Sequence, residues 1–160
     1  MLQSIFAAME DWEISQIITD EPFWFPALET LHVGALTFVV GTILFVDLRL
    51  MGLAGRYEPA RTSLRILSLT WAAFAIAAAS GTLMFAPAAA RYAANSAFQL
   101  KMLAMALAGL NMLAFHFGPW RRIASWNEGR PPASARACGL VSMALWIAAV
   151  ILGRYVPFTQ

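Results

Sequence analysis

The chain has 160 residues, of which 60% are hydrophobic and only 12% are charged, and its mean hydropathy is +0.64. This composition excludes a soluble globular domain, a disordered protein and a nucleic-acid-binding module. Cys138 is the single cysteine, so no internal disulfide can form. Eleven basic and nine acidic residues give a formal net charge of +2, so the placement of the charges is more informative than their sum.

Residues 1–21 predict an amphipathic helix in the membrane interface. At helical spacing one face collects Leu2, Ile5, Phe6, Met9 and Trp12. The segment has no positive n-region and acidic residues interrupt it, so we expect it to be retained rather than cleaved as a signal peptide. Two roles remain open for it: a cap packed on the mouth of a helix bundle, or a docking site for a partner.

Four long apolar runs in residues 22–160 predict four membrane-spanning helices, because each exceeds the roughly 20 residues that a bilayer requires. The helix caps expected from the sequence are Gly55 after the first run, a capping box of Ser96 with Gln99, and Ser134. The predicted spans cover residues of about 26–53, 64–90, 96–117 and 134–155. The predicted fold class is therefore an all-α integral membrane protein, an antiparallel four-helix bundle preceded by the interfacial helix.

Small residues crowd the second and third spans, for example over residues 72–81. Small faces allow helices to approach closely, and this is the reading we favour. The same lack of side-chain bulk would also leave room for a flat macrocycle between helices.

The arginines predict the orientation, because short loops rich in Lys and Arg stay in the cytoplasm. Arginines flank the connections after the first and third spans, whereas residues 1–29 carry six acids and no base. We therefore expect a multi-pass protein of the bacterial inner membrane with both termini in the periplasm.

Ionisable groups inside a span are costly and are candidates for function by default. At about 1.5 Å of rise per residue, His32 on the first span and Lys101 on the third lie at the same depth near the outer surface. Glu29 is one turn above His32, and Arg154 ends the fourth span at the same side. The sequence therefore predicts an outer polar cluster of Glu29, His32, Lys101 and Arg154.

Three interpretations of His32 are open: an axial ligand of haem b, a member of a proton or ion-pair relay with Glu29 and Lys101, or a hydrogen bond to a neighbouring helix. With haem, the sixth position would be vacant or taken by Lys101, Met102 or Met105. His116 lies roughly 20 Å deeper, so two histidines of one chain cannot share an iron.

Other metal centres are not favoured by the pattern. Glu29 and His32 spell the Glu-x-x-His unit of di-iron bundles, but the remaining spans supply no second copy. The eight methionines are scattered rather than clustered as in copper-handling proteins. Phosphate-binding loops, Cys-x-x-Cys pairs and nucleophile elbows are absent from the sequence.

Two segments carry a resemblance to known families, LETLHVGALTFVVGTILFVDLRL at residues 28–50 and FQLKMLAMALAGLNMLAFH at residues 98–116. The first resembles a helix of the HemJ-type protoporphyrinogen oxidases and the copper-resistance-D-like membrane proteins. The second has the lysine and later histidine of the HemJ type. The whole pattern is more similar to an uncharacterised family of small four-helix bacterial inner-membrane proteins. The HemJ resemblance implies haem b on His32, an essential Lys101, and a porphyrin-like or quinone substrate.

The function expected from these observations is haem-b binding in electron transfer, or as the membrane subunit of a redox complex. His32 is the expected iron ligand, and Lys101, Arg154, Glu29 and Met105 are expected around the cofactor. The first alternative is a non-catalytic accessory subunit with a buried lock of Glu29, His32 and Lys101, and the second is HemJ-type porphyrinogen oxidase activity. Membrane lipid, other membrane subunits or a second copy of the chain are the expected partners, and nucleic acid is not.

Overall fold

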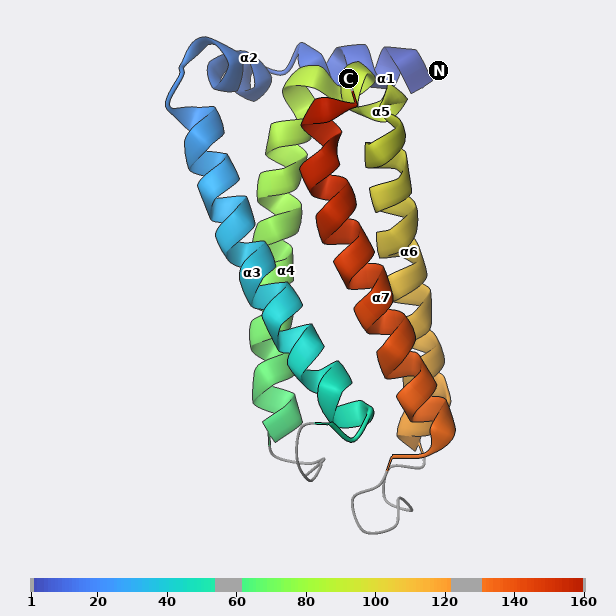
Figure 1. The fold of residues 1–160 in the computed structure, drawn as a ribbon. Helices are drawn as coiled ribbons and strands as arrows, with labels where there is room; N and C mark the ends of the chain where they lie inside the picture. The colour runs from blue at the N-terminus through green and yellow to red at the C-terminus, as the bar shows by residue number, and fades with distance from the viewer. Residues whose placement is uncertain (1, 54–61, 122–130, 160) are drawn as a thin grey trace.

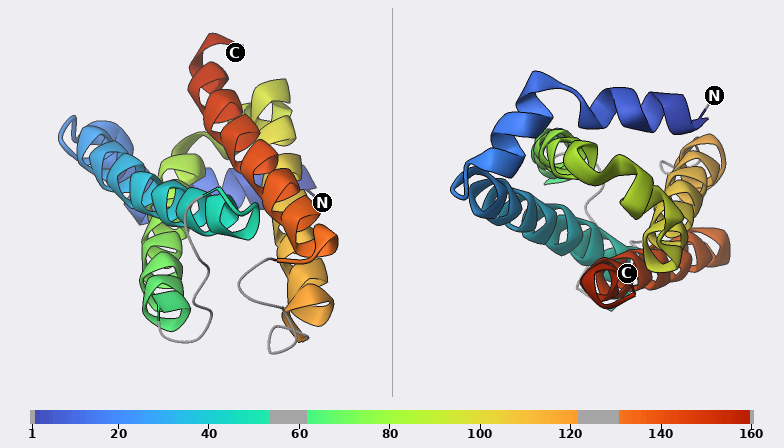
Figure 2. Two further views of the ribbon diagram at one scale, coloured as in Figure 1. Left: turned by 60° about the horizontal axis from the view of Figure 1, so that its bottom comes forward. Right: turned by 90° about the horizontal axis from the view of Figure 1, so that it is seen from above.

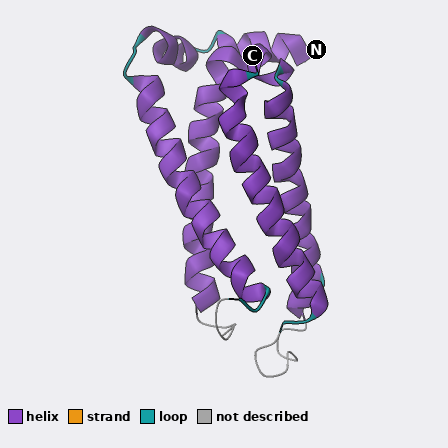
Figure 3. Ribbon diagram, viewed as in Figure 1, coloured by secondary structure: helices purple, strands orange, loops and turns teal. Residues whose placement is uncertain are grey.

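The structure, a computed structural model, describes residues 2–53, 62–121 and 131–159. Helices make up almost all of these residues, and no strand occurs among them (Figure 3). Four long helices run side by side and two short ones lie across one end of them (Figure 1). The expected all-α fold is confirmed.

The four long helices are α3 (Trp24–Leu50), α4 (Thr62–Phe85), α6 (Ser96–Phe117) and α7 (Ala133–Tyr155). Their lengths of 22 to 27 residues, together with their apolar composition, are sufficient to cross a membrane. The 27 residues of α3 correspond to about 40 Å, which exceeds a hydrocarbon core of roughly 30 Å. Helix α3 is therefore long enough to span such a core even when it is tilted.

The bundle consists of two closely packed helix pairs. Helix α3 packs along α4, and α6 packs along α7. The two pairs meet mainly where α3 crosses α7, whereas α4 and α6 barely contact each other over their described residues. Figure 2 shows the two pairs from two further directions.

Alanine dominates the contacts between the long helices. The large apolar side chains are mostly exposed on the outer surface, as expected for a bundle whose solvent is lipid. Because small side chains let two backbones approach, polar side chains of one helix can reach the backbone of the next. The buried small residues of the long helices are Ala35, Ala73, Ala77, Ser80, Ala97, Ala104, Ala108, Ala135, Gly139 and Ala149.

Helix α3 ends earlier than the sequence suggested. Its last residue is Leu50, and Gly52 then adopts φ +79°, which is the left-handed conformation that glycine tolerates best. The amide of Leu53 donates to the carbonyl of Leu48 and so satisfies one of the last carbonyls of the helix. Gly55, the residue expected to end this span, lies outside the described residues.

The expected caps of α6 and α7 are wrong. Asn95, not Ser96, precedes α6 in extended conformation, and its Oδ1 accepts a hydrogen bond from the amide of Phe98 at 3.0 Å. Gln99 Nε2 instead donates backwards to the carbonyl of Ala93. Helix α7 begins directly after Pro132 and has no side-chain cap, so Ser134 lies inside the helix.

The connection between α4 and α6 is helical. It consists of the short 3-10 helix η1 (Ala86–Ala88) and α5 (Ala89–Ala94), so the expected second span of residues 64–90 divides near Pro87. Proline lacks the amide hydrogen that a continuing helix would need. Another 3-10 helix, η4 (Val156–Phe158), follows α7, and both termini lie at this end of the bundle (Figure 1).

The N-terminal segment forms two helices where one was expected, α1 (Leu2–Glu10) and α2 (Glu13–Asp20). They lie across the end of the bundle and contact η1, α3, α4 and α5 (Figure 1). Phe6 packs edge-on against Phe85 with ring centroids 6.3 Å apart, and a Glu10 carboxylate oxygen accepts from the amide of Ala90 at 2.9 Å. These contacts are those of a cap on the bundle.

Candidate functional site

His32 lies at the contact between α3 and α4. Its Nδ1 lies 2.8 Å from the carbonyl oxygen of Ala77 and 3.1 Å from Oγ of Ser80. The ring covers Gly81, where an added Cβ atom would be only 2.9 Å from Cε1 of His32. The absence of a side chain at position 81 therefore allows the imidazole to lie against the backbone of α4.

The hydrogen bonds of His32 determine which ring nitrogen carries a proton. A carbonyl oxygen only accepts, so Nδ1 must donate to Ala77. The hydroxyl of Ser80 donates to the carbonyl of Ile76 at 2.7 Å, and its oxygen is then a second acceptor for the Nδ1 hydrogen. In the neutral ring this leaves the lone pair on Nε2, to which no described residue makes a hydrogen bond.

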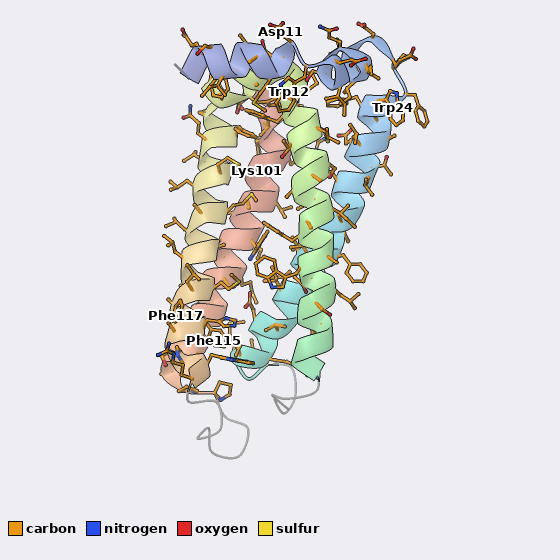
Figure 4. All side chains as sticks on the ribbon, turned by 180° about the vertical axis from the view of Figure 1, so that it is seen from behind. Asp11, Trp12, Trp24, Lys101, Phe115 and Phe117 are labelled. Carbon is orange, nitrogen blue, oxygen red and sulfur yellow. The ribbon has the colours of Figure 1, made fainter. Side chains whose placement is uncertain are left out.

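Lys101 lies across the bundle from His32, on the half-buried face of α6. Its side chain runs along α7, and an added Cβ atom on Gly153 would be 3.6 Å from Nζ. The ammonium charge is near enough to act electrostatically on His32. Met105 is one turn further along the same half-buried face. Figure 4 places Lys101 in the half of the bundle nearer to α1 and α2.

The expected four-residue cluster forms only in part. Glu29 and Arg154 are both exposed, and neither makes an ion pair with a described residue. Arg154 instead lies over the ring of Phe158, with 5.1 Å between its guanidinium carbon and the ring centroid. Leu28, not Glu29, continues the inward-facing stripe of His32, Ala35 and Val39 on α3. The structure thus places His32 against α4 and Lys101 along α7, and it leaves Glu29 and Arg154 exposed.

His116 is in the last turn of α6, at the opposite end of the bundle from α1 and α2, where Figure 4 shows Phe115 and Phe117. It is exposed, and its ring stacks on Trp120 with centroids 5.7 Å apart. The two histidines are therefore separate, as expected. In the part of the chain that the structure describes, no three His, Cys, Asp or Glu side chains are grouped as metal ligands.

A cavity of about 280 Å³ lies beneath the N-terminal cap. Its polar side chains are Thr19, Arg91 and Tyr92, and the remaining lining is apolar, including Phe25 and Met84. Phe25 is two turns from His32 along α3, and Met84 is one turn from Gly81 along α4. The cavity is therefore next to the His32 site, on the side of the termini.

Sequence reasoning assigned no role to Asp47, which the structure buries to 4% exposure where α3 meets α7. The hydroxyl of Ser142 hydrogen-bonds its carboxyl group, whereas Oδ2 is buried without a hydrogen-bond partner. Nearby, Asn111 Nδ2 donates to the carbonyl of Cys138 at 2.9 Å and ties α6 to α7. The sequence does contain a signal for Asp47, because an acidic residue inside an apolar span is costly and is therefore a candidate for function.

These observations define an all-α helical-bundle membrane protein in which His32 lies at the α3–α4 contact and Lys101 lies along α7. No protein-family model matches the chain, and no curated protein or solved structure is significantly similar to it.

Proposed function

We propose that the chain binds haem b in the bacterial inner membrane and serves in electron transfer, or as the membrane subunit of a redox complex. The supporting observation is the hydrogen bonding of His32. Histidines that bind metals usually donate from the other ring nitrogen to a carbonyl or carboxylate, which fixes the tautomer and the ring orientation. Nδ1 of His32 makes this bond to Ala77, and Nε2 remains free to bind iron.

The other residues around the site fit the same group. The ring would lie between the helix pairs, where α4 and α6 make few contacts and carry small side chains such as Ala77 and Ala104. Lys101 supplies a positive charge on the far wall, and Arg91 and Tyr92 line the cavity on the side of the termini. Acidic propionate groups prefer such a cationic edge near water.

Each protein group then has a separate task. Ala77 and Ser80 hold the imidazole of His32 in one orientation, and Lys101 balances negative charge. The apolar helices exclude water from the iron side of the ring. Bound haem would supply one-electron transfer, with a quinone, a porphyrin or a protein as the redox partner. Met105 on α6 would be the candidate for a second iron ligand.

An absorbance spectrum of the protein purified in detergent tests the proposal. We expect a Soret band in the wild type and its loss in His32→Ala. His116→Ala is the control, because it removes the other histidine, which lies at the opposite end of the bundle, and it should keep the band. A colourless wild type that is fully helical by circular dichroism after expression with added haem would contradict the proposal.

The proposed topology places both termini in the periplasm. The common end of the two termini carries the acidic α1 and α2, whereas Arg49, Arg121 and Arg136 lie near the opposite ends of α3, α6 and α7. Fusing a reporter that is active only in the periplasm to the C-terminus should give signal. Signal only from a cytoplasmic reporter would reverse the assignment.

A non-catalytic accessory subunit is the second candidate function. It is favoured by the bonds from His32 to Ala77 and Ser80, which by themselves connect α3 to α4. The exposed Glu29 gives no support to the three-residue lock that we expected. This candidate predicts no chromophore, and His32→Gln should then retain stability if its amide donates to Ala77.

HemJ-type porphyrinogen oxidation is the more specific alternative. It takes its support from the resemblance of the two segments and from Lys101 near His32. Complementation of a bacterial strain that lacks protoporphyrinogen oxidation would test it, with Lys101→Met expected to abolish rescue and Arg154→Met expected to retain it. Failure of the wild type to rescue would reject this activity without affecting haem binding.

A further inference from the structure

Asp47 is placed where an ionised carboxylate is costly. It is 4% exposed, it lies three residues before the end of α3, and it faces α7. Ser142 provides its one described hydrogen bond, and Oδ2 has none. A charged carboxylate buried in apolar surroundings with a single neutral donor is unfavourable, whereas a protonated carboxyl group needs less solvation.

Among the side chains that the structure describes, no charged group forms an ion pair with Asp47. On its own helix, Arg49 lies over the ring of Phe45 at 4.5 Å. On α7, Cys138 is half-buried and Arg136 is exposed, and neither forms an ion pair with Asp47. Helix α4 presents no titratable group among the side chains that the structure describes.

The backbone of α3 at Asp47 is in close contact with α7. An added Cβ atom on Gly139 of α7 would lie 3.1 Å from the backbone oxygen of Asp47 and 3.2 Å from Cβ of Leu50. The backbones of α3 and α7 therefore touch at this point, and the 4% exposure of Asp47 shows that little of it is open to solvent in this arrangement. This contact is also the main connection between the two helix pairs along the bundle.

We infer that Asp47 is a proton-binding site whose neutral form closes the contact between α3 and α7. The proton resides on Oδ2, and Ser142 bonds the other oxygen. Because Asp47 is about 4.5 Å from the end of α3, a small separation of the two helices connects it to the aqueous phase. Loss of the proton leaves a carboxylate that requires water, so the α3–α7 contact loosens. This inference does not depend on haem.

Infrared spectroscopy tests the proton directly. In ²H₂O, the wild type should show the C=O stretching band of a protonated carboxyl group, and this band should disappear reversibly as the pH is raised. Asp47→Asn should lack it, and the exposed acid Asp20→Asn should keep it. Ser142→Ala should shift the band because one hydrogen bond to the carboxyl group is lost. Absence of a protonated band in the wild type from pH 5 upwards would overturn the inference.

The reactivity of the native cysteine, Cys138, measures whether the contact between α3 and α7 has opened. Cys138 is adjacent to Gly139 and is the single cysteine of the chain, so its reaction with a maleimide measures access to this contact. Thiol reactivity itself rises with pH, so each wild-type rate is divided by that of Asp47→Asn at the same pH. We expect the ratio to increase several-fold as the infrared band disappears. A ratio that stays constant would show that the proton does not control the contact.

Discussion

A Cβ atom added to Gly81 would lie 2.9 Å from Cε1 of His32, although the two residues are on different helices. A Cβ atom and a ring carbon cannot approach so closely without a steric clash. The observed position of the His32 ring therefore requires glycine at position 81. The imidazole can donate to the backbone of α4 because position 81 has no side chain.

Gly81→Ala should therefore displace the imidazole. We expect a destabilisation of about 1–3 kcal/mol from overpacking, and in the haem-loaded protein a weakened or shifted Soret band. Reversible thermal unfolding in detergent and the absorbance spectrum measure the two effects. Gly41→Ala is the control, since nothing lies within 4 Å of its added Cβ atom; it should be neutral or slightly stabilising and should leave the spectrum unchanged. Equal behaviour of the two variants would contradict the packing described for His32.

Gly139 and Gly153 of α7 provide a second comparison. An added Cβ atom at Gly139 meets the backbone oxygen of Asp47 at 3.1 Å, whereas at Gly153 the nearest atoms, those of the Lys101 side chain, are 3.6 Å away. Gly139→Ala should cost about 1–2 kcal/mol, because a backbone atom cannot move aside easily. Gly153→Ala should be nearly neutral or slightly stabilising. Unfolding monitored by circular dichroism would reveal the difference, and a larger loss at Gly153 would refute it.

Asn95 connects three segments at the end of the bundle that holds both termini. Its Oδ1 accepts from Phe98 and Thr159, and its Nδ2 donates to the carbonyl of Val156 at 3.0 Å. Asn95→Ala should destabilise the protein by about 1–3 kcal/mol, because a helix cap and a buried hydrogen bond are lost together. Ser96→Ala should have an effect of less than about 0.5 kcal/mol, as at ordinary surface positions. A larger loss of stability in Ser96→Ala than in Asn95→Ala would instead support the capping box of Ser96 and Gln99 that the sequence predicts.

Phe6 fastens α1 to the bundle through Phe85. Removing the ring in Phe6→Ala should release α1, because an edge-to-face pair contributes about 0.5–1.5 kcal/mol in addition to the area that it buries. Hydrogen–deuterium exchange of the amides of residues 3–10 should then accelerate while α4 stays protected. Ile5 is 47% exposed, so Ile5→Ala should leave exchange in α1 almost unchanged. If both variants exchange alike, lipid rather than Phe85 holds this helix.

The long helices were predictable because their signal is local. The third span, expected over residues 96–117, is observed over the same residues, and the fourth is observed one residue earlier than expected. An apolar run of this length has few alternatives in a membrane, since every backbone polar group must be bonded internally. The ends of the helices were less predictable. Several neighbouring residues have a similar propensity to cap a helix, so the sequence did not single out Asn95 before α6 or Gly52 after α3.

The site was only half predictable. Depth along each helix predicts that His32 and Lys101 lie at a similar level, since rise per residue is nearly constant. Rotation about each axis was not determined: Leu28 rather than Glu29 follows the inward stripe, and Arg154 turns outward to Phe158.

From its residues alone, this chain specified four apolar helices, their order and the depth of each polar group, because those properties follow from composition and from distance along a helix. Tertiary structure decided which helices pair, which nitrogen of His32 stays free and which acid is buried. Ala77 and Ser80 are 45 and 48 residues from His32, and Ser142 is on a different helix from Asp47, so only the packing of the helices brings these groups into contact.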